Sequence, residues 1–287
     1  QHHVIPTPDL ILQLGRGFTT KKYENWTRTI SVKHIIIDSR DSRYDPGHSC
    51  SWRLQADLSY LEFLEDLRSP NISWIRRLQI QLHNISIPKQ TVSEIAIAHQ
   101  LPSWLPKDSH LFIGNSMPIR DCNNYSLLAE NIVLACNRGV SGIDGIISTA
   151  AGWAVGNQKH SFLLVGDISF MHDIGVLFSL QATSASLTIV LINNSGGGIF
   201  SFLPVSKEED VFETHFATKH SFNLAPIAQA MGIHVQSISS MMELKIGLEQ
   251  PKKGLSILEV RTDREQNYRE HQAIIQEVTS QLKALDI

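Results

Sequence analysis

The chain has 287 residues, of which 42% are hydrophobic and 18% are charged, and its formal net charge is -3. This length suits one large domain or two of ordinary size, and the charge gives no reason to expect nucleic acid or an anionic membrane as the main partner. The longest apolar runs are strand-length and far shorter than the roughly 20 residues that cross a bilayer, so no membrane span is expected. The three cysteines, Cys50, Cys122 and Cys136, are too widely spaced for a disulfide framework or a zinc site, which indicates a reducing compartment.

The first 70 residues predict two consecutive strand–helix units. Each strand is short and apolar, and a segment with helix signals follows it. Thr19 or Thr20 can cap the first helix, because a threonine oxygen accepts a hydrogen bond from a free backbone N–H at that position. Residues 69–73, which contain Ser, Pro and Asn, mark a domain boundary. The expected strands are residues 11–17 and 32–39, and the expected helices are residues 19–28 and 57–68.

Residues 71–287 predict a larger parallel sheet. Its strand segments are continuously apolar, which is typical of a sheet covered by helices on both faces. The expected fold is therefore α/β with a doubly wound parallel sheet, in which ligands bind at the carboxyl ends of the strands. The polar residues and glycines of this part collect at those ends. The expected strands are residues 110–116, 131–137, 161–167, 187–194 and 255–262, and a helix is expected at residues 172–183 with Ile174, Leu177 and Phe178 on one face.

Two of these strands bring an acidic and an amide side chain to the same edge. Asp167 closes one strand and Asn194 closes the next, about one βαβ unit of roughly 30 residues further on. If the two strands are neighbours, their ends lie about 5 Å apart. A carboxylate and an amide carbonyl at that separation can share one Mg²⁺ ion, which also takes phosphate oxygens as ligands. No Lys or Arg occurs between residues 166 and 197, so a metal would supply the positive charge for a bound anion.

The same stretch also suits an ordinary βαβ unit with a turn rich in Asn and Gly, because both residues favour turns for local reasons. Two nucleotide-binding motifs are excluded. The sequence has no GxxxxGK[ST] segment and so no Walker P-loop, and Gly139, Gly142 and Gly145 have GxxGxxG spacing in place of the dinucleotide pattern GxGxxG. A metal–diphosphate site and a structural turn are the two interpretations that the residues alone leave open.

The GD and NN pairs resemble the cofactor motif of the thiamine-diphosphate decarboxylase and acetolactate-synthase superfamily. The usual motif begins GDG, whereas Ile168 follows the GD pair here. Further segments resemble one family of that superfamily, the SEPHCHC synthases, in which an aliphatic residue and Ser usually follow GD. The resemblance runs through almost the whole chain. Its segments are LGRGFTTKKYENW (14–26), IIIDSRDSRYDPGHS (35–49), GNSMPIRD (114–121), NRGVSGIDGIISTAAG (137–152), GDISFMHDIG (166–175), NNSGGGIFSFLP (193–204) and RTDREQNYREH (261–271).

The resemblance implies a site for thiamine diphosphate with Mg²⁺ or Mn²⁺. Asp167, Asn194 and the backbone carbonyl of Gly196 match the metal ligands. Ser169 and neighbouring N–H groups would reach the diphosphate. Ile143 would support the bent cofactor, although without the resemblance it would be interpreted as an ordinary core residue. The resemblance also assigns residues 1–70 to the C-terminal part of a central α/β domain and residues 71–287 to the pyrophosphate-binding domain.

The resemblance further implies a transferase that decarboxylates 2-oxoglutarate and adds the remaining four-carbon unit to isochorismate, in menaquinone or phylloquinone biosynthesis. Ser116, Arg120 and Arg138 match active-site positions, and Ser116 would contact the cofactor as well. Arginine suits the carboxylates of both substrates, because its planar fork binds them at two points. Phe200 and Leu203 match the apolar wall near the reacting carbon, a role that is compatible with plain packing.

Lys21 and Lys22 match basic residues that approach the substrate from the central domain, and a solvated helix face explains them nearly as well. In this superfamily a glutamate on a separate N-terminal domain, usually from the partner subunit, activates the cofactor. No catalytic residue is assigned in this chain, because its candidate glutamates lie in segments that do not match that position. These glutamates are Glu94, Glu130, Glu208, Glu209 and Glu213.

The chain is therefore expected to be a fragment, one half of a split protein or a degenerate copy, and its intact motifs argue against the last. The missing pyrimidine-binding domain would act in cis or in trans, within a homodimer or homotetramer of the bacterial cytoplasm or plastid stroma. The chain alone is expected to bind Mg²⁺–thiamine diphosphate weakly, with negligible turnover. Two alternatives stay open, another thiamine-diphosphate 2-oxoacid decarboxylase or acetolactate-synthase-like enzyme, and a non-catalytic subunit that keeps the fold.

Overall fold

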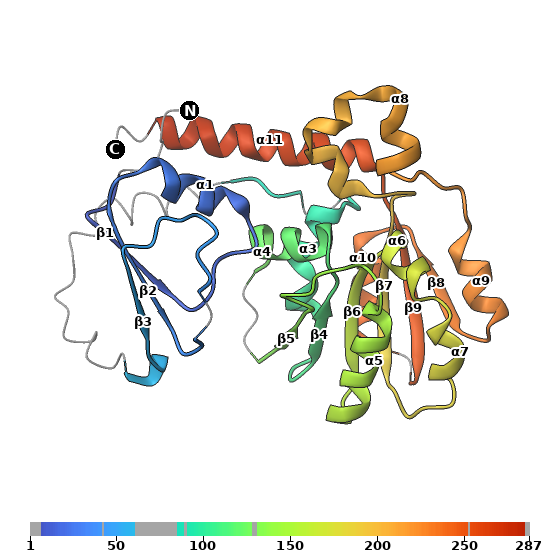
Figure 1. Cartoon of the computed structure of the whole chain (residues 1–287). Helices are drawn as coiled ribbons and strands as arrows, with labels where there is room; N and C mark the ends of the chain where they lie inside the picture. Colours follow the sequence, from blue (N-terminus) through green and yellow to red (C-terminus); the bar gives the residue numbers. More distant parts are fainter. Residues whose placement is uncertain are drawn as a thin grey trace. The chain divides into compact units, whose positions relative to one another are not determined.

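The computed structural model describes residues 7–41, 43–60, 85–88, 91–127, 131–251 and 253–284. The chain divides into two compact units. Residues 1–85 and 275–287 form the first unit, and residues 86–274 form the second. In Figure 1 the strands of the first unit are blue, and those of the second run from green to orange.

The first unit contains a parallel sheet of three strands in the order β1-β2-β3. Its helix α1 begins where the side chain of Thr20 accepts a hydrogen bond from the backbone N–H of Lys22 at 3.2 Å, which confirms one of the two expected caps. β3 has mostly exposed residues and no apolar strand pattern, so the sequence did not indicate it. Most of the helix expected at residues 57–68, and the boundary expected at 69–73, lie outside the described residues. The bounds are β1 Leu10–Leu14, α1 Lys21–Thr29, β2 Lys33–Asp38 and β3 Trp52–Gln55.

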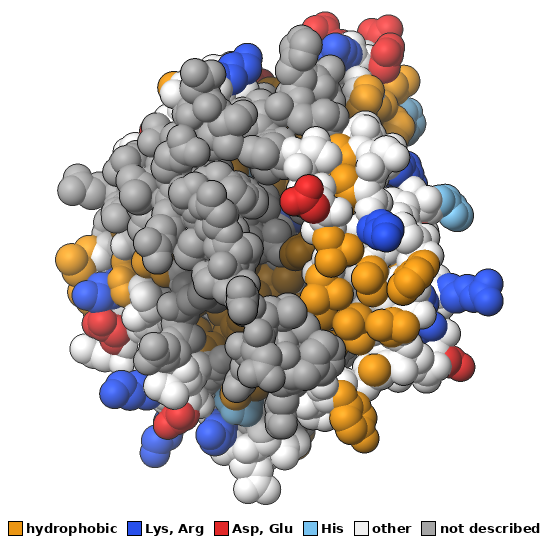
Figure 2. Space-filling model, turned by 90° about the vertical axis from the view of Figure 1, so that its left-hand side faces the viewer, with side chains coloured by type: hydrophobic (Ala, Val, Ile, Leu, Met, Phe, Trp, Pro, Cys, Tyr) orange, Lys and Arg blue, Asp and Glu red, His pale blue; other side chains and the backbone are white. Residues whose placement is uncertain are grey.

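One face of this small sheet carries exposed hydrophobic side chains. The parallel register places Leu12 of β1 and Trp52 of β3 on either side of Ile35 in β2. Leu12 and Trp52 are both exposed. Figure 2 shows that hydrophobic side chains reach the surface at several places of the face that it views. An apolar face of this kind is typical of a surface that contacts another element or another protein.

The second unit contains a six-stranded sheet in which every pairing is parallel. The strand order is β5-β4-β6-β7-β9-β8. After β4 the chain forms β5 on one side of that strand and then β6 on the opposite side. The sheet therefore has a topological switch point between β4 and β6, which is where ligands bind in open α/β sheets. The strands are β4 His110–Ile113, β5 Val133–Ala135, β6 Ser161–Gly166, β7 Leu187–Asn193, β8 His234–Ile238 and β9 Leu255–Arg261.

Helices cover both faces of the large sheet (Figure 1). α3, α4 and α10 pack in one core cluster, and α5, α6, α7 and α9 pack in another. Alternate residues of β6 belong to different clusters. Phe162 and Leu164 belong to the first cluster, and Leu163 and Val165 belong to the second. This confirms the doubly wound sheet.

The helices of the second unit have the following bounds. They are α3 Glu94–Trp104, α4 Met117–Tyr125, α5 Ile146–Asn157, α6 Asp167–His172, α7 Val176–Leu180, α8 Glu209–Val211, α9 Leu224–Ala230 and α10 Met241–Glu249. Tighter or wider helical turns occur at Gly198–Phe202, Pro204–Lys207 and Phe212–Phe216. Helix α11, Arg264–Lys283, begins in the second unit and ends in the first.

The segment after β6 differs from the single helix expected at residues 172–183. It forms the two short helices α6 and α7, which are separated at Asp173. The carboxylate of Asp173 accepts hydrogen bonds from the backbone N–H and the hydroxyl of Ser148, at 2.7 and 2.9 Å. Leu177 is buried but Phe178 is 75% exposed, so the prediction that Phe178 shares the buried face was wrong.

Two strands of the large sheet also differ from expectation. β5 is shorter than the strand expected at residues 131–137. It forms one edge of the sheet, where its residue Val133 is half exposed. β8 forms the other edge, and its polar and half-exposed residues lack the continuous apolar pattern of an interior strand. Within the part of the chain that the structure describes, no helix is long and apolar enough to cross a membrane.

Candidate active site

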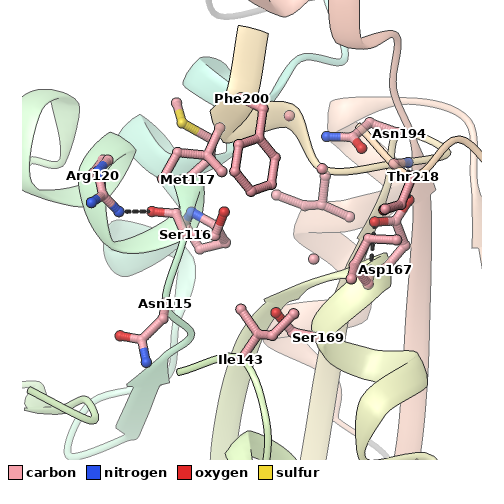
Figure 3. A pocket seen from close by; sticks show the side chains of 18 of the residues that line it. Asn115, Ser116, Met117, Arg120, Ile143, Asp167, Ser169, Asn194, Phe200 and Thr218 are labelled. Carbon is pink, nitrogen blue, oxygen red and sulfur yellow. Dashed lines mark hydrogen bonds between the residues drawn. The ribbon is translucent and has the colours of Figure 1, made fainter. Parts of the chain in front are cut away.

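A cavity of about 630 Å³ opens at the carboxyl ends of the central strands, on either side of the switch point between β4 and β6. Figure 3 shows Ser116 and Arg120 on one side of the cavity, with Asp167 and Asn194 across from them. Most of the residues that the sequence predicted for the site therefore meet in one place. Those that line the cavity are Ser116, Arg120, Arg138, Ile143, Asp167, Ser169, Asn194, Gly196 and Phe200.

Asp167 is held from three directions. The pairing of β6 with β7 brings the ends of the two strands together, as expected, with Gly166 beside Ile192. Oδ1 of Asp167 accepts a hydrogen bond from the N–H of Ile168 at 2.7 Å, and Oδ2 accepts one from the N–H of Gly196 at 3.1 Å. Nε2 of His220 lies 3.1 Å from the same Oδ2. Burial raises the pKa of Asp167, and these neighbours act in the opposite direction.

The two ends of the Asn194 amide have different surroundings. Its Nδ2 donates to Oε1 of Glu94 at 2.8 Å, whereas its Oδ1 is buried and has no hydrogen-bond partner among the residues that the structure describes. A buried carbonyl oxygen without a partner is costly unless something else satisfies it. A divalent cation beside Asp167 would do so, because carboxylate, amide and backbone oxygens are the ligands that Mg²⁺ prefers.

The loop after Asn194 fits that donor set. A Cβ on Gly196 would lie 2.7 Å from the carbonyl oxygen of Ala217, so only glycine fits between that backbone and the cavity. The described residues contain no cluster of three or more His, Cys, Asp or Glu side chains that could hold a metal. A site made of one carboxylate, one amide and one backbone carbonyl does not need such a cluster.

The opposite wall is positively charged. Nη1 of Arg120 donates to the carbonyl oxygen of Ser116 at 2.6 Å, and Nη1 of Arg138 approaches Oδ1 of Asn115 at 3.5 Å. Burial, and then the charge of Arg138, lowers the pKa of Arg120. Two neighbouring guanidinium groups at a cavity favour an anion, and a carboxylate suits their geometry.

The backbone of Ser116, which lines the cavity, is strained. Its φ is 72° and its ψ is -128°, a combination that residues other than glycine rarely adopt. The hydrogen bond from Arg120 holds the Ser116 carbonyl in this position. Strain of this kind persists only where the surroundings fix it, and it is concentrated at functional sites.

Two apolar side chains line the space between the charged walls. Ile143 and Phe200 approach the cavity from opposite sides (Figure 3). The loop that carries Ile143 is fastened by Nδ2 of Asn115, which donates to the carbonyl oxygen of Gly142 at 2.6 Å. Phe200 packs edge-on against Phe216. Both apolar side chains are therefore held by local contacts.

Glu94 is a cavity residue to which sequence reasoning gave no role. It is the first residue of α3 and is only 2% exposed. Burial, and then the nearby carboxyl of Asp121, raises the pKa of Glu94 to about 8. The one signal in the sequence is its place at the start of the apolar segment EIAIAHQL, where a charged residue is unexpected on a buried helix. His220 and Asn115 were missed as well. Asn115 lies in the segment GNSMPIRD that carries the resemblance, whereas no sequence pattern marks His220.

Three predicted site residues lie elsewhere. Leu203 is 45% exposed and is not among the described residues that line the cavity, so its place in the apolar wall stays a prediction. Lys21 and Lys22 are exposed residues at the start of α1 in the first unit. Of the other glutamates considered, Glu213 bonds Arg264, and Glu130 lies outside the described residues.

Two of the segments that carry the family resemblance meet beside the cavity. Asp121, which ends GNSMPIRD, lies 3.1 Å from Nε2 of His271, which ends RTDREQNYREH. The hydroxyl of Tyr125 is 2.9 Å from the other ring nitrogen of His271. Asp121 and His271 are both buried. This contact fixes α4, and with it the neighbouring Arg120, against the start of α11.

Replacing Gly196 with alanine is expected to lower the free energy of unfolding by about 1–3 kcal/mol, because the added Cβ collides with a backbone carbonyl. Gly152 is the matched control. It lies inside α5 with open space around it, so Gly152→Ala is expected to stabilise the chain by about 0.5–1 kcal/mol. Urea unfolding of the two variants measures both effects. A Gly196→Ala variant as stable as the parent would contradict the geometry described for the loop.

Comparison with known families agrees with this site. The family described as the middle domain of thiamine pyrophosphate enzymes matches residues 2–113, and the C-terminal thiamine-pyrophosphate-binding domain of the same enzymes matches residues 128–260. The chain therefore belongs to the thiamine pyrophosphate enzymes and contains their cofactor-binding domain. This confirms the predicted superfamily.

Curated relatives narrow the family further. The chain is similar to proteins named 2-succinyl-5-enolpyruvyl-6-hydroxy-3-cyclohexene-1-carboxylate synthase, or SEPHCHC synthase. The one from Chlorobium phaeobacteroides is 37% identical over 93% of this chain and 48% of the relative, and the one from Prosthecochloris aestuarii is 36% identical over 96% and 49%. The relative from Listeria welshimeri is 34% identical over 98% of this chain and 51% of its own length. The chain thus spans about half the length of the curated relatives that it matches.

Proposed function

We propose that this chain is the C-terminal part of a synthase that depends on thiamine diphosphate and Mg²⁺. The synthase decarboxylates 2-oxoglutarate and adds the four-carbon unit that remains to isochorismate. The names of the curated relatives support this substrate pair. The observation that carries the proposal is the arrangement of the cavity, in which Oδ1 of Asn194, without a partner among the described residues, lies beside Asp167 and opposite Arg120.

The carboxyl ends of β6 and β7 would hold the cofactor. Asp167, Asn194 and the carbonyl of Gly196 would bind the metal ion, and Ser169 would reach the diphosphate. When bound, thiamine diphosphate supplies the group that stabilises the negative charge left on carbon by decarboxylation of a 2-oxo acid. Ile143 would support the cofactor from the far side of the cavity. The metal ligands need no nearby Lys or Arg, because the ion itself neutralises the diphosphate.

The wall formed by α4 and the end of β5 would hold the substrates. Arg120 and Arg138 would bind substrate carboxylates, and Ser116 would lie between the substrate and the cofactor. Phe200 would exclude water from the reacting carbon, which matters because water competes for such a carbanion equivalent. The protein's contribution is thus to orient two carboxylate substrates and to keep the space between them dry.

The group that activates the pyrimidine ring would come from outside this chain. The curated relatives are about twice as long as the region they share with the chain, and the matched families are the middle and C-terminal domains. A further domain in cis or in trans, within a homodimer or homotetramer, would complete the site. Glu94 does not replace that group in this proposal, because it is already bonded to Asn194 and Thr262.

The test is the substrate pair. The protein that contains this chain is supplied with thiamine diphosphate, Mg²⁺, isochorismate and either 2-oxoglutarate or pyruvate, and release of carbon dioxide is measured. We expect release of carbon dioxide from 2-oxoglutarate but not from pyruvate, together with consumption of isochorismate. Release from pyruvate instead would identify a different 2-oxoacid decarboxylase, and no release from protein with bound cofactor would favour a non-catalytic subunit.

A further inference from the structure

The buried carboxyl of Glu94 has a specific position that packing alone does not explain. It opens α3, where Ser93 caps the helix by accepting from the N–H of Ala96 at 3.2 Å. Its charged neighbours are the carboxyls of Asp121 and Asp167, both of which disfavour a charge on Glu94. An apolar residue would avoid this cost. The contacts that Glu94 makes must therefore be its reason for being there, and they lead to the proposed metal ligand.

Oε1 of Glu94 accepts two hydrogen bonds. One comes from Nδ2 of Asn194 at 2.8 Å, and the other comes from the hydroxyl of Thr262 at 3.1 Å. Thr262 follows β9, and its N–H donates to the carbonyl oxygen of Asn193 at 3.0 Å. Glu94 thus joins the start of α3 to the ends of β7 and β9 at the wall of the cavity.

The orientation of the Asn194 amide depends on this contact. An asparagine side chain presents a donor at one end and an acceptor at the other, so whichever group binds the NH₂ determines where the oxygen points. Glu94 binds the NH₂ group, and Oδ1 is left buried with no partner in the described part of the chain. Gly198 confines the amide on another side, since a Cβ there would lie 3.0 Å from Nδ2. Among the described residues, the bond to Glu94 is the one hydrogen bond that distinguishes one end of the amide from the other.

We propose that Glu94 is a positioning residue for the cation site, which directs the carbonyl oxygen of Asn194 toward the metal by binding its NH₂ group. This inference rests on the proposed metal site and adds a residue that the family match does not assign. Residues that orient metal ligands from behind commonly change metal affinity about 10- to 100-fold when they are removed. Glu94 acts through Asn194 and does not itself touch the ion.

Binding of Mn²⁺ in the presence of thiamine diphosphate, followed by electron paramagnetic resonance, tests this without any turnover. Glu94→Leu is expected to weaken Mn²⁺ binding about 10- to 100-fold. Glu94→Gln keeps the acceptor oxygen and is expected to bind Mn²⁺ close to the wild-type level. Thr262→Val is the matched control, because it removes the other hydrogen bond to the same oxygen and leaves Asn194 in place. Circular dichroism confirms that each variant is folded.

A second variant covers the case in which Glu94→Leu does not fold. Glu94→Asp keeps a carboxyl group but shortens the side chain by one methylene, so its oxygen no longer reaches Nδ2 of Asn194 and Mn²⁺ binding should weaken. If Glu94 mattered only as a buried polar group, folded Glu94→Asp and Glu94→Gln would bind Mn²⁺ alike.

The outcomes separate the two proposals. Normal Mn²⁺ binding by folded Glu94→Leu, or by folded Glu94→Asp, would overturn the role of Glu94 while leaving the metal site intact. Absence of Mn²⁺ binding in the wild-type protein would overturn the proposed metal site itself, and the role of Glu94 with it.

Discussion

Replacing Asp167 with alanine is expected to abolish Mg²⁺-dependent binding of thiamine diphosphate while the chain stays folded. Asp167 is the one carboxylate in the proposed ligand set, and its loss leaves only neutral oxygens to hold a divalent ion beside a diphosphate. Because burial raises the pKa of this carboxyl, its removal also relieves an unfavourable burial in the chain without metal. We expect the affinity for the cofactor to fall by at least about 100-fold, the loss of roughly 3 kcal/mol.

Asp173 provides the matched control for this variant. It lies just after the same short helix and bonds Ser148, and it is not among the described residues that line the cavity. Asp173→Ala is therefore expected to lower stability slightly and to leave cofactor affinity near the wild-type value. Calorimetric titration of thiamine diphosphate in Mg²⁺ buffer compares the two variants. Equal affinity of both would remove Asp167 from the metal site.

The second large effect is expected from the arginines of the opposite wall. In the protein that contains this chain, Arg120→Ala should raise the KM for the proposed substrate 2-oxoglutarate by about 10- to 100-fold, because a hydrogen bond to a charged group contributes about 1.5–3 kcal/mol. Arg120→Lys should recover only part of the loss, since lysine cannot form the two-point contact. Cofactor affinity should change little in either variant, because Arg120 lies across the cavity from Asp167.

Arg269 is a suitable control for the charge change. It pairs with Glu265 on the surface of α11, and its side chain is 76% exposed. Arg269→Ala is therefore expected to leave KM unchanged, since an exposed ion pair contributes little. If Arg120→Ala behaved like Arg269→Ala in a steady-state assay, the charged wall would not be the substrate site.

The cofactor side of the cavity could be predicted from the sequence because it depends on strand ends. In a parallel sheet the carboxyl ends of neighbouring strands meet at one edge, so the positions of Asp167 and Asn194 in two consecutive strands were sufficient to bring them together. The resemblance then added Ser116 and Arg120, at the start of α4 and within it, and Arg138, which follows β5. All of these residues follow strands that are apolar enough to be recognised without a structure.

The residues that contact Asp167 and Asn194 from other parts of the chain could not be predicted, because their positions depend on long-range packing. Glu94 lies on a helix that comes before all six strands of the large sheet, and no spacing rule connects it to Asn194. His220 belongs to a loop without any periodic pattern, and yet it reaches Asp167. Phe178 has helical spacing, but the break at Asp173 turns its side chain toward the surface. Local patterns do not encode such contacts.

The proposed site depends most directly on one cation that joins this cavity to a diphosphate. Titration calorimetry of thiamine diphosphate into the wild-type chain, once in Mg²⁺ and once in EDTA, measures that dependence. We predict saturable binding in Mg²⁺ and no binding in EDTA. Binding in Mg²⁺ should be weak, because the proposal assigns the pyrimidine side of the site to a domain outside this chain. Inorganic pyrophosphate should compete. Equal binding in EDTA, or no binding by a folded chain in Mg²⁺, would contradict the account.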